Sequence, residues 1–186
     1  GSKGTCYVDL GADKFAGESV TIEMWVTLRT LKDWTRIFVI GGASGSWTVC
    51  NSRRASGEGN VFNFDSFNGT QKGDKSLAKD VKYHIAVTYA PDGAGGIVER
   101  QYVTKADGES VWTGEVKKSG WAVSANAAQD YFWLGHSNGN DPDTNAEYDE
   151  IRVWTGALGA EAIAASVKKG PDATAEDLAA IAAADS

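Results

Sequence analysis

SVTIEMWVTL, residues 19–28, predicts a β-strand with one fully apolar face. Every second side chain in it is large and apolar, and this set is Val20, Ile22, Met24 and Val26. Successive side chains of a strand point to opposite faces of its sheet, so the apolar set shares one face and Glu23 and Trp25 share the other. The segment therefore indicates a sheet that packs its apolar face against a core.

Short alternating segments of this kind recur along the chain, separated by Gly, Asp and Asn, which tolerate turns. We expect strands near residues 5–10, 20–28, 35–41, 47–53, 60–67, 82–90, 98–104, 109–117, 131–136 and 147–155. Many short strands at this spacing are typical of an antiparallel sandwich and not of βαβ units. The sequence therefore predicts an all-β fold with two packed antiparallel sheets.

The C-terminal part follows another pattern. Residues 158–169 and 174–184 are Ala-rich, carry apolar residues at helical spacing and predict two short helices. Leu178 and Ile181 are the large apolar residues of the second helix, which gives it little to dock with. We expect a tag or linker at residues 1–4, one β-sandwich domain at 5–170 and an Ala-rich helical tail or linker at 171–186.

Composition limits the partners. The 18 basic and 25 acidic residues give a net charge of −7, which disfavours nucleic acid and anionic lipid surfaces as partners. No apolar run approaches the roughly 20 residues that cross a bilayer, so we expect no membrane insertion. Cys6 and Cys50 fit either two buried free thiols or, in an oxidising compartment, one bridge between neighbouring strands.

Four segments, taken in order, resemble the laminin-G-like jelly roll of the concanavalin A-like lectin and glucanase superfamily, which occurs in many extracellular bacterial proteins. They are YVDLG at 7–11, SVTIEMWVTL at 19–28, YHIAVTY at 83–89, and YFWLGHS followed by YDEIRVWTGALGAEAI at 131–163. The order and spacing of these segments carry the resemblance, which covers residues 5–170. It implies a jelly-roll sandwich in a secreted or cell-surface protein.

Enzyme chemistry finds no support in the residues. Relatives with this fold include glucanases, which cleave sugars with two carboxylates about 5 to 5.5 Å apart. Their E-x-D-x-x-E pattern does not occur, because Arg152 stands where the last glutamate would follow Glu147 and Asp149. His84 and His136 have no serine or cysteine in a strained elbow to act with. We expect no enzymatic activity and interpret His84 as a structural histidine.

The resemblance also implies a structural Ca²⁺ site. In related binding modules and glucanases, the aspartate that heads the closing strand often ligates the ion beside carbonyls at the exit of the first strand. The matching position is Asp149, with Gly11 and Asp13 as the opposite contributors. Residues 138–145 are rich in the oxygen ligands that hard cations prefer. The alternative is that Asp149 only forms a salt bridge or caps a turn.

Sugar binding needs aromatic rings against the C–H surface of a pyranose and planar polar groups for its hydroxyls. Phe62 and Phe64 are expected in the core. The outward positions of the neighbouring strands would then carry Trp47, Asn51, Arg53, Asp65 and Phe67, and Trp112 is a further candidate at a strand end. The alternative is a cross-strand ion pair between Asp65 and Arg53 on a solvated sheet. If this face belongs to the core, the next candidates are Trp34, Trp112 and Trp121.

These features together predict a non-catalytic, lectin-like module that binds a polysaccharide or glycan and forms part of a larger secreted bacterial protein. Laminin-G-like sandwiches also bind proteins, so a protein-contacting or spacer domain of a cell-surface protein stays open as the alternative. The two functions differ in one observable, because only the first predicts a response to glycans. A glycoside hydrolase is the less favoured alternative.

Overall fold

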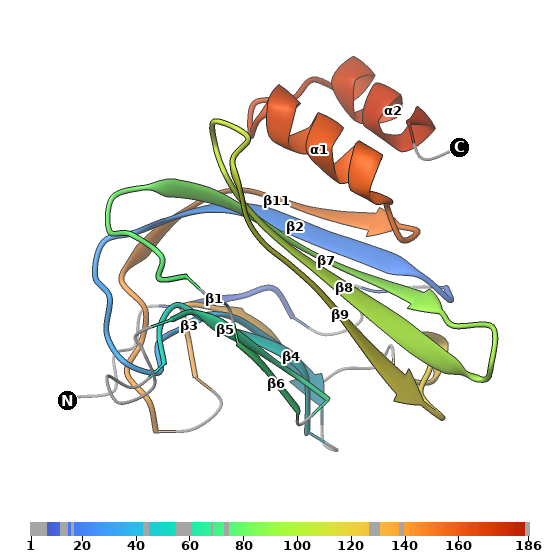
Figure 1. Cartoon of the computed structure of the whole chain (residues 1–186), viewed down its shortest axis with the longest axis horizontal. Helices are drawn as coiled ribbons and strands as arrows, with labels where there is room; N and C mark the ends of the chain where they lie inside the picture. The colour runs from blue at the N-terminus through green and yellow to red at the C-terminus, as the bar shows by residue number, and fades with distance from the viewer. Residues whose placement is uncertain are drawn as a thin grey trace. The chain divides into compact units, whose positions relative to one another are not determined.

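The computed structural model describes residues 7–11, 15, 17–42, 45–54, 61–67, 69–72, 75–126, 131–137 and 140–184. Within these residues, eleven strands form two antiparallel sheets, and two α-helices follow at the C-terminal end (Figure 1). The chain divides into two compact units: Gly1–Lys14, Thr27–Val81 and Asn126–Glu147 form one, and Phe15–Val26, Lys82–Ala125 and Tyr148–Ser186 form the other. The sheets and helices are those of a jelly-roll sandwich, so the predicted fold class is confirmed.

The first unit holds a six-stranded sheet in the order β1-β10-β3-β4-β5-β6. Its strands are β1 (Val8–Asp9), β3 (Arg36–Gly42), β4 (Gly45–Asn51), β5 (Asn63–Ser66), β6 (Gly69–Lys72) and β10 (Tyr131–Leu134). Phe38 lies opposite Cys50, and Cys50 lies opposite Phe64, so the three buried side chains share one apolar face. Phe62 is also buried, with its ring centroid 6.3 Å from that of Phe64. Both phenylalanines therefore belong to the core, as expected.

A β-bulge at the start of β3 changes which face its first residue occupies. Arg36 pairs with Asn51, whereas Phe38, two residues later, pairs with the adjacent Cys50. The additional residue, Ile37, shifts the alternation, so Arg36 lies beside Asn51 and away from the apolar face. A second difference concerns the strand that the sequence predicts at 60–67, because the chain instead forms β5 and returns in β6.

The second unit holds both helices and most of the five-stranded sheet, whose order is β11-β2-β7-β8-β9; residues 27–28 of β2 and 146–147 of β11 belong to the first unit. The elements are β2 (Val20–Leu28), β7 (Lys82–Pro91), β8 (Gly96–Lys105), β9 (Ser110–Ser119), β11 (Ala146–Thr155), α1 (Ala160–Lys169) and α2 (Ala175–Ala183). Figure 1 shows the two helices lying together over this sheet. Because α1 covers its outer face, β2 is buried on both faces, and His84 and Ala86 of β7 are buried too.

The second helix is docked, although its sequence offers few large apolar residues. Ile181 is 1% exposed and packs in an apolar cluster with Ala86, Leu158 and Ile163, and Leu178 packs against the same cluster. This burial differs from the expectation that α2 has little to dock with. No helix among the described residues is long and apolar enough to span a membrane.

Candidate functional site

The face of the six-stranded sheet opposite its apolar core carries a connected set of planar polar side chains. The register places Arg36, Asn51 and Asn63 opposite one another on β3, β4 and β5. The Asn51 amide donates to Asp65 Oδ2 at 2.8 Å, and the Asn63 amide donates to Asp65 Oδ1 at 3.0 Å. Arg36 Nη1 donates to Asn51 Oδ1. A guanidinium, two amides and a carboxylate are thus fixed side by side.

Arg36 also anchors this set to the neighbouring loops. Its Nη2 donates to Asp141 Oδ2 at 2.8 Å, and its Nη1 donates to the Trp34 carbonyl at 2.9 Å. Burial lowers the pKa of the Arg36 guanidinium, and the carboxylates of Asp141 and Asp65 act in the opposite direction. The cation therefore lies between two carboxylates that compensate its charge.

The residues of this set differ in how far they are buried. Asn51 and Asn63 are fully buried, whereas Arg36, Asp65 and Asp141 are half-buried. Among the described residues, Arg36 Nε and Asn63 Oδ1 are buried without a hydrogen-bond partner. An unsatisfied buried polar atom costs about 1–3 kcal/mol, so its retention calls for a reason other than stability. The side chains of Arg36 and Asp141 keep 12% and 33% of their surface exposed, so these two groups, unlike the two amides, are open to solvent.

Two half-buried aromatic side chains extend this face across the sheet. The register aligns Trp133 of β10 with Val39, Val49 and Asp65 in successive strands, so their side chains share one face. Tyr131 and Trp133 stack with ring centroids 4.3 Å apart, and a Cβ atom at Gly41 would collide with the Tyr131 ring. We call Arg36, Asn51, Asn63, Asp65, Tyr131 and Trp133 the sheet-face site.

The structure brings two of the binding residues predicted from sequence together and places the others apart from them. Asn51 and Asp65 lie together in the sheet-face site, linked by the 2.8 Å hydrogen bond. Arg53 Nε donates to Asp33 Oδ1 at 2.6 Å, so the structure gives Arg53 a partner other than Asp65. Trp47 is only 4% exposed, which differs from its expected outward position.

Phe67 and Trp112 lie elsewhere. Phe67 is half-buried in the turn after β5 with φ +51°, and its backbone N–H donates to the Trp47 carbonyl at 2.9 Å. Trp112 belongs to β9 of the other sheet, where its indole N–H donates to Gln101 Oε1 at 3.4 Å. Neither is part of the row that contains Asp65.

Sequence reasoning assigned no binding role to Arg36, Tyr131 or Trp133. Asn63 had a usable signal, since it alternates with Phe62 and Phe64 and so shares the face of Asp65. Arg36 had none, because the bulge at Ile37 reverses its phase. Trp133 lies in the segment YFWLGHS, which we interpreted as a marker of the fold and did not consider for binding.

The residues predicted to hold calcium lie as follows. Asp149 is in β11, and its Oδ2 accepts from Lys82 Nζ at 2.7 Å. The Gly11 backbone N–H donates to Asp9 Oδ1 at 2.8 Å, and Asp13 lies outside the described residues. Within the described part of the chain, no group of three or more His, Cys, Asp or Glu side chains could hold a metal ion. Calcium binding stays a prediction.

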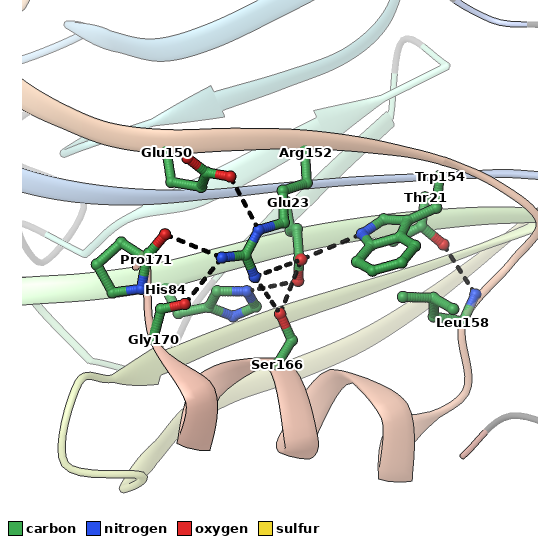
Figure 2. A network of polar contacts seen from close by, with 10 residues as sticks. All are labelled: Thr21, Glu23, His84, Glu150, Arg152, Trp154, Leu158, Ser166, Gly170 and Pro171. Atoms are coloured by element: carbon green, nitrogen blue, oxygen red, sulfur yellow. Dashed lines mark hydrogen bonds and ion pairs between the residues drawn. The ribbon is translucent and has the colours of Figure 1, made fainter. Parts of the chain in front are cut away.

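A buried glutamate and histidine, Glu23 and His84, form the centre of a second polar network (Figure 2). His84 Nε2 lies 2.9 Å from Glu23 Oε2, while Ser166 Oγ and Trp154 Nε1 donate to Glu23 Oε1 at 2.7 and 3.1 Å. Burial acts to raise the pKa of Glu23, but the hydrogen bonds and the nearby His84 outweigh it and lower the pKa from its usual 4.5. Glu23 is thus stabilised as a carboxylate.

Arg152 extends this network to the end of α1. Its Nη1 lies 3.4 Å from Glu23 Oε1 and 3.1 Å from Ser166 Oγ, and its Nη2 donates to the carbonyls of Gly170 and Pro171 at 2.8 and 3.1 Å. Glu23 and His84 are both 0% exposed. The network fastens α1 to the sheet, in agreement with a structural role for His84.

The comparisons with solved structures find domains of the same fold, two of them solved with a bound oligosaccharide. Domain 4 of an extracellular GH43 arabinanase from Geobacillus stearothermophilus, solved with arabinotriose, has a TM-score of 0.58 at 18% identity over 85% of this chain and 70% of its own. A CBM40 of a Ruminococcus gnavus sialidase, bound to sialyllactose, has a TM-score of 0.57 at 14% identity over 88% and 92%. A SAP-like pentraxin from Limulus polyphemus has a TM-score of 0.58 at 13% identity over 83% and 72%.

These identities are low, so the structural similarities establish the fold alone. A search among curated proteins found no match. One family model matches most of the chain, from residue 2 to residue 164. The matched residues include the strands β1 to β11 and the start of α1. On this match, the chain belongs to the laminin-G-type members of the concanavalin A-like lectin/glucanases superfamily.

Proposed function

We propose that this chain is a non-catalytic carbohydrate-binding module and that a glycan lies across its sheet-face site. The observation that carries the proposal is the row formed by Arg36, Asn51, Asn63 and Asp65 on one sheet face, with Trp133 on the same face. Guanidinium and carboxylate groups bind vicinal hydroxyls, and aromatic rings contact the C–H surface of a sugar. The buried Asn51 and Asn63 amides hold the Asp65 carboxylate in place.

The dimensions of the face suit an oligosaccharide. Trp133 and Asp65 are separated by three strand spacings, which is about 14 Å. The polar groups are already hydrogen-bonded to one another, so little conformational entropy is lost when a sugar binds. Such a preformed surface favours a short stretch of a chain, with one ring near Trp133 and another near Asp65.

The test is binding of the purified chain to a glycan array, followed by titration of the strongest glycan with two variants. Tyr131→Ala removes an aromatic ring. Asp65→Asn keeps the side-chain volume but replaces one acceptor oxygen by a donor, which then faces the amide donor of either Asn51 or Asn63. A loss of about 1–2 kcal/mol lowers affinity about 5- to 30-fold. If the wild-type dissociation constant is about 1 mM, a loss of this size brings the affinity close to the detection limit. We therefore expect both variants to lose most of the detectable binding.

Arg100→Gln and Glu115→Gln serve as matched controls. These residues form an exposed ion pair at 3.1 Å on β8 and β9, and their replacement should change neither binding nor folding. Silence of the wild-type chain across plant, algal and host glycans would refute the proposal and favour a protein-contacting or spacer domain. Unchanged affinity in both sheet-face variants would place the sugar elsewhere.

We further propose that the module works outside the cell within a larger bacterial protein. Two structural neighbours support this context, since one is named as a domain of an extracellular arabinanase and another as a module of a sialidase. The sequence of the full-length parent protein tests the proposal, because it should show an export signal and a catalytic or adhesive domain. A parent that consists of this domain alone would contradict it.

A further inference from the structure

A pocket of about 530 Å³ opens at one end of the five-stranded sheet, within the second unit. The loop between β7 and β8, the residues after β9 and the segment before β2 surround it. Its lining includes Glu18, Gly93, Gly95, Ile97, Trp121 and Ala125, which we call the hairpin pocket. The volume lies within the range of about 300–1,000 Å³ that is usual for small-molecule sites.

The loop that forms one wall is held in a single conformation. Asp92 Oδ1 accepts from the backbone N–H groups of Ala94 and Gly96 at 2.7 and 2.9 Å, and the Asp92 N–H donates to the Gly96 carbonyl at 3.0 Å. A Cβ atom at Gly96 would lie 2.5 Å from the Lys118 carbonyl oxygen, so that position accepts only glycine. The wall is therefore preorganised, which reduces the entropic cost of binding.

Glycines bring the backbone to the pocket surface. Gly93 and Gly95 have φ values of +74° and +84°, and a Cβ atom at either would meet no atom within 4 Å. The glycine side is thus open to a ligand, and the peptide groups are available to hydroxyls without an intervening side chain. The Gly120 N–H donates to the Gly95 carbonyl at 3.1 Å and joins the loop to the residues after β9.

The remaining wall combines one aromatic ring with one carboxylate. Trp121 is half-buried, and its ring centroid lies 6.3 Å from that of the buried Tyr89. Glu18 is exposed and is the charged side chain among the described residues of the lining. An indole face suits the C–H surface of a sugar ring, and a carboxylate accepts from two hydroxyls but repels anionic sugars.

We infer that the hairpin pocket is a second carbohydrate site, which takes one or two rings of a neutral sugar against Trp121 with Glu18 as hydroxyl acceptor. The inference rests on the proposed function for its class of ligand, but the pocket shares no residue with the sheet-face site. Two sites on one module raise the apparent affinity for a ligand that offers several sugar units.

Protein-observed ¹H–¹⁵N NMR of the intact chain tests the inference, with methyl β-D-glucopyranoside, methyl β-D-galactopyranoside, cellobiose and lactose as probes. We expect at least one neutral sugar to shift the Trp121 indole N–H and the amides of Gly93 and Gly95, with a dissociation constant near about 1 mM. Trp121→Ala should lower this affinity at least tenfold. Trp121→Phe, which keeps an aromatic ring, should retain part of it.

Two further variants separate binding from folding. Ala125→Leu places a larger side chain in the pocket from an exposed position, so it should abolish the shifts without lowering the melting temperature. Glu18→Gln removes the negative charge and should therefore raise the affinity for the anionic methyl glucuronide. We expect the preference for methyl glucoside over methyl glucuronide to fall by about five- to tenfold. Unchanged binding in Ala125→Leu would overturn the pocket assignment.

The sheet-face variant Tyr131→Ala distinguishes failure of this inference from failure of the proposed function. If it abolishes glycan retention while no neutral sugar shifts the pocket signals, the sheet-face site stands and the pocket is refuted. If the pocket signals shift in both wild type and Tyr131→Ala, and glycan retention is also unchanged, the pocket is supported and the sheet-face site is refuted. Absence of both responses would overturn both assignments.

Discussion

Glu23 shows how a single buried charge links stability to pH. Its carboxylate accepts hydrogen bonds from Ser166 and Trp154 and lies against His84, and its pKa is lowered from 4.5 in the folded chain. A group whose pKa is depressed on folding contributes stability above its unfolded pKa and loses it as pH falls through its folded pKa. This contribution is therefore complete at neutral pH and declines as the pH falls below 4.5.

We predict that Glu23→Gln destabilises the chain by about 3 kcal/mol at pH 7, because it removes one partner from a buried charged network. The difference from wild type should narrow between pH 4 and pH 2. Urea unfolding at pH 7, 4 and 3 measures it. Glu115→Gln is the control, since its exposed pair with Arg100 should contribute no more than about 1 kcal/mol. If the difference in unfolding free energy between wild type and Glu23→Gln is the same at every pH, the charge of Glu23 does not contribute to stability.

Individual site residues were predictable only where alternation is regular. Asn51 and Asp65 follow the period-two pattern of their strands, so their shared face could be inferred from sequence. Arg36 could not be placed, because one additional residue at the bulge reverses its face. Trp47 was assigned to the outward side from the same alternation, yet it is buried. Period two assigns a side chain to a face but does not determine what covers that face.

At the level of elements, α2 is part of the folded unit. Its first turn has a capping box, in which Thr174 Oγ1 accepts from the Asp177 N–H at 3.2 Å and the Asp177 carboxylate accepts from the Thr174 N–H at 3.0 Å. Ile181 supplies the buried contact. Neither feature requires a large apolar face, and this explains how an Ala-rich helix can dock.

We predict that Ile181→Ala lowers the unfolding free energy by about 2–4 kcal/mol, as expected for a buried isoleucine. The half-buried Leu178→Ala should cost less, and Ala182→Ser, at an exposed position, should cost little. Thermal and urea unfolding measure the three variants at equal protein concentration. Equal stability of wild type and Ile181→Ala would mean that α2 is a detached tail.

The strands differ in how well their sequences predicted them. Alternation over nine or ten residues located β2, β7 and β11 to within one or two residues. The β5–β6 hairpin was missed as a pair, because each strand has only four residues and a turn with Phe67 in the left-handed conformation separates them. Short strands carry too few alternations to define a period.

For the whole molecule, the order of the motifs predicted the family and the two-sheet fold, whereas the candidate site required coordinates. Many apolar positions along the chain predict the same two-sheet fold, so an error in assigning one position has little effect on the predicted fold. The site depends on which strands are neighbours, as in the adjacency of β10 and β3 that brings Trp133 to the face of Asp65. Strand adjacency between segments far apart in sequence is not encoded in local patterns.

Calcium binding at Asp149 is the remaining prediction for the whole molecule. An ion at 100 times its dissociation constant adds about 2.7 kcal/mol, which corresponds to about 5–10 °C in melting temperature. We therefore expect EDTA to lower the melting temperature of the wild type. Lys82→Met should tighten the site, because it removes the ammonium group 2.7 Å from Asp149 Oδ2. Equal melting in EDTA and Ca²⁺ for both proteins would exclude the ion.

The buried side chain of Cys50 allows the opening of the six-stranded sheet to be measured. The thiol is buried between Phe38 and Phe64 in the register, so an alkylating reagent reaches it only when this sheet separates from its core. In a Cys6→Ser background, the labelling rate relative to that of an unfolded thiol gives the free energy of that opening. Alkylation kinetics at increasing urea would thus show whether the sheet that carries Asp65 opens before the rest of the chain unfolds.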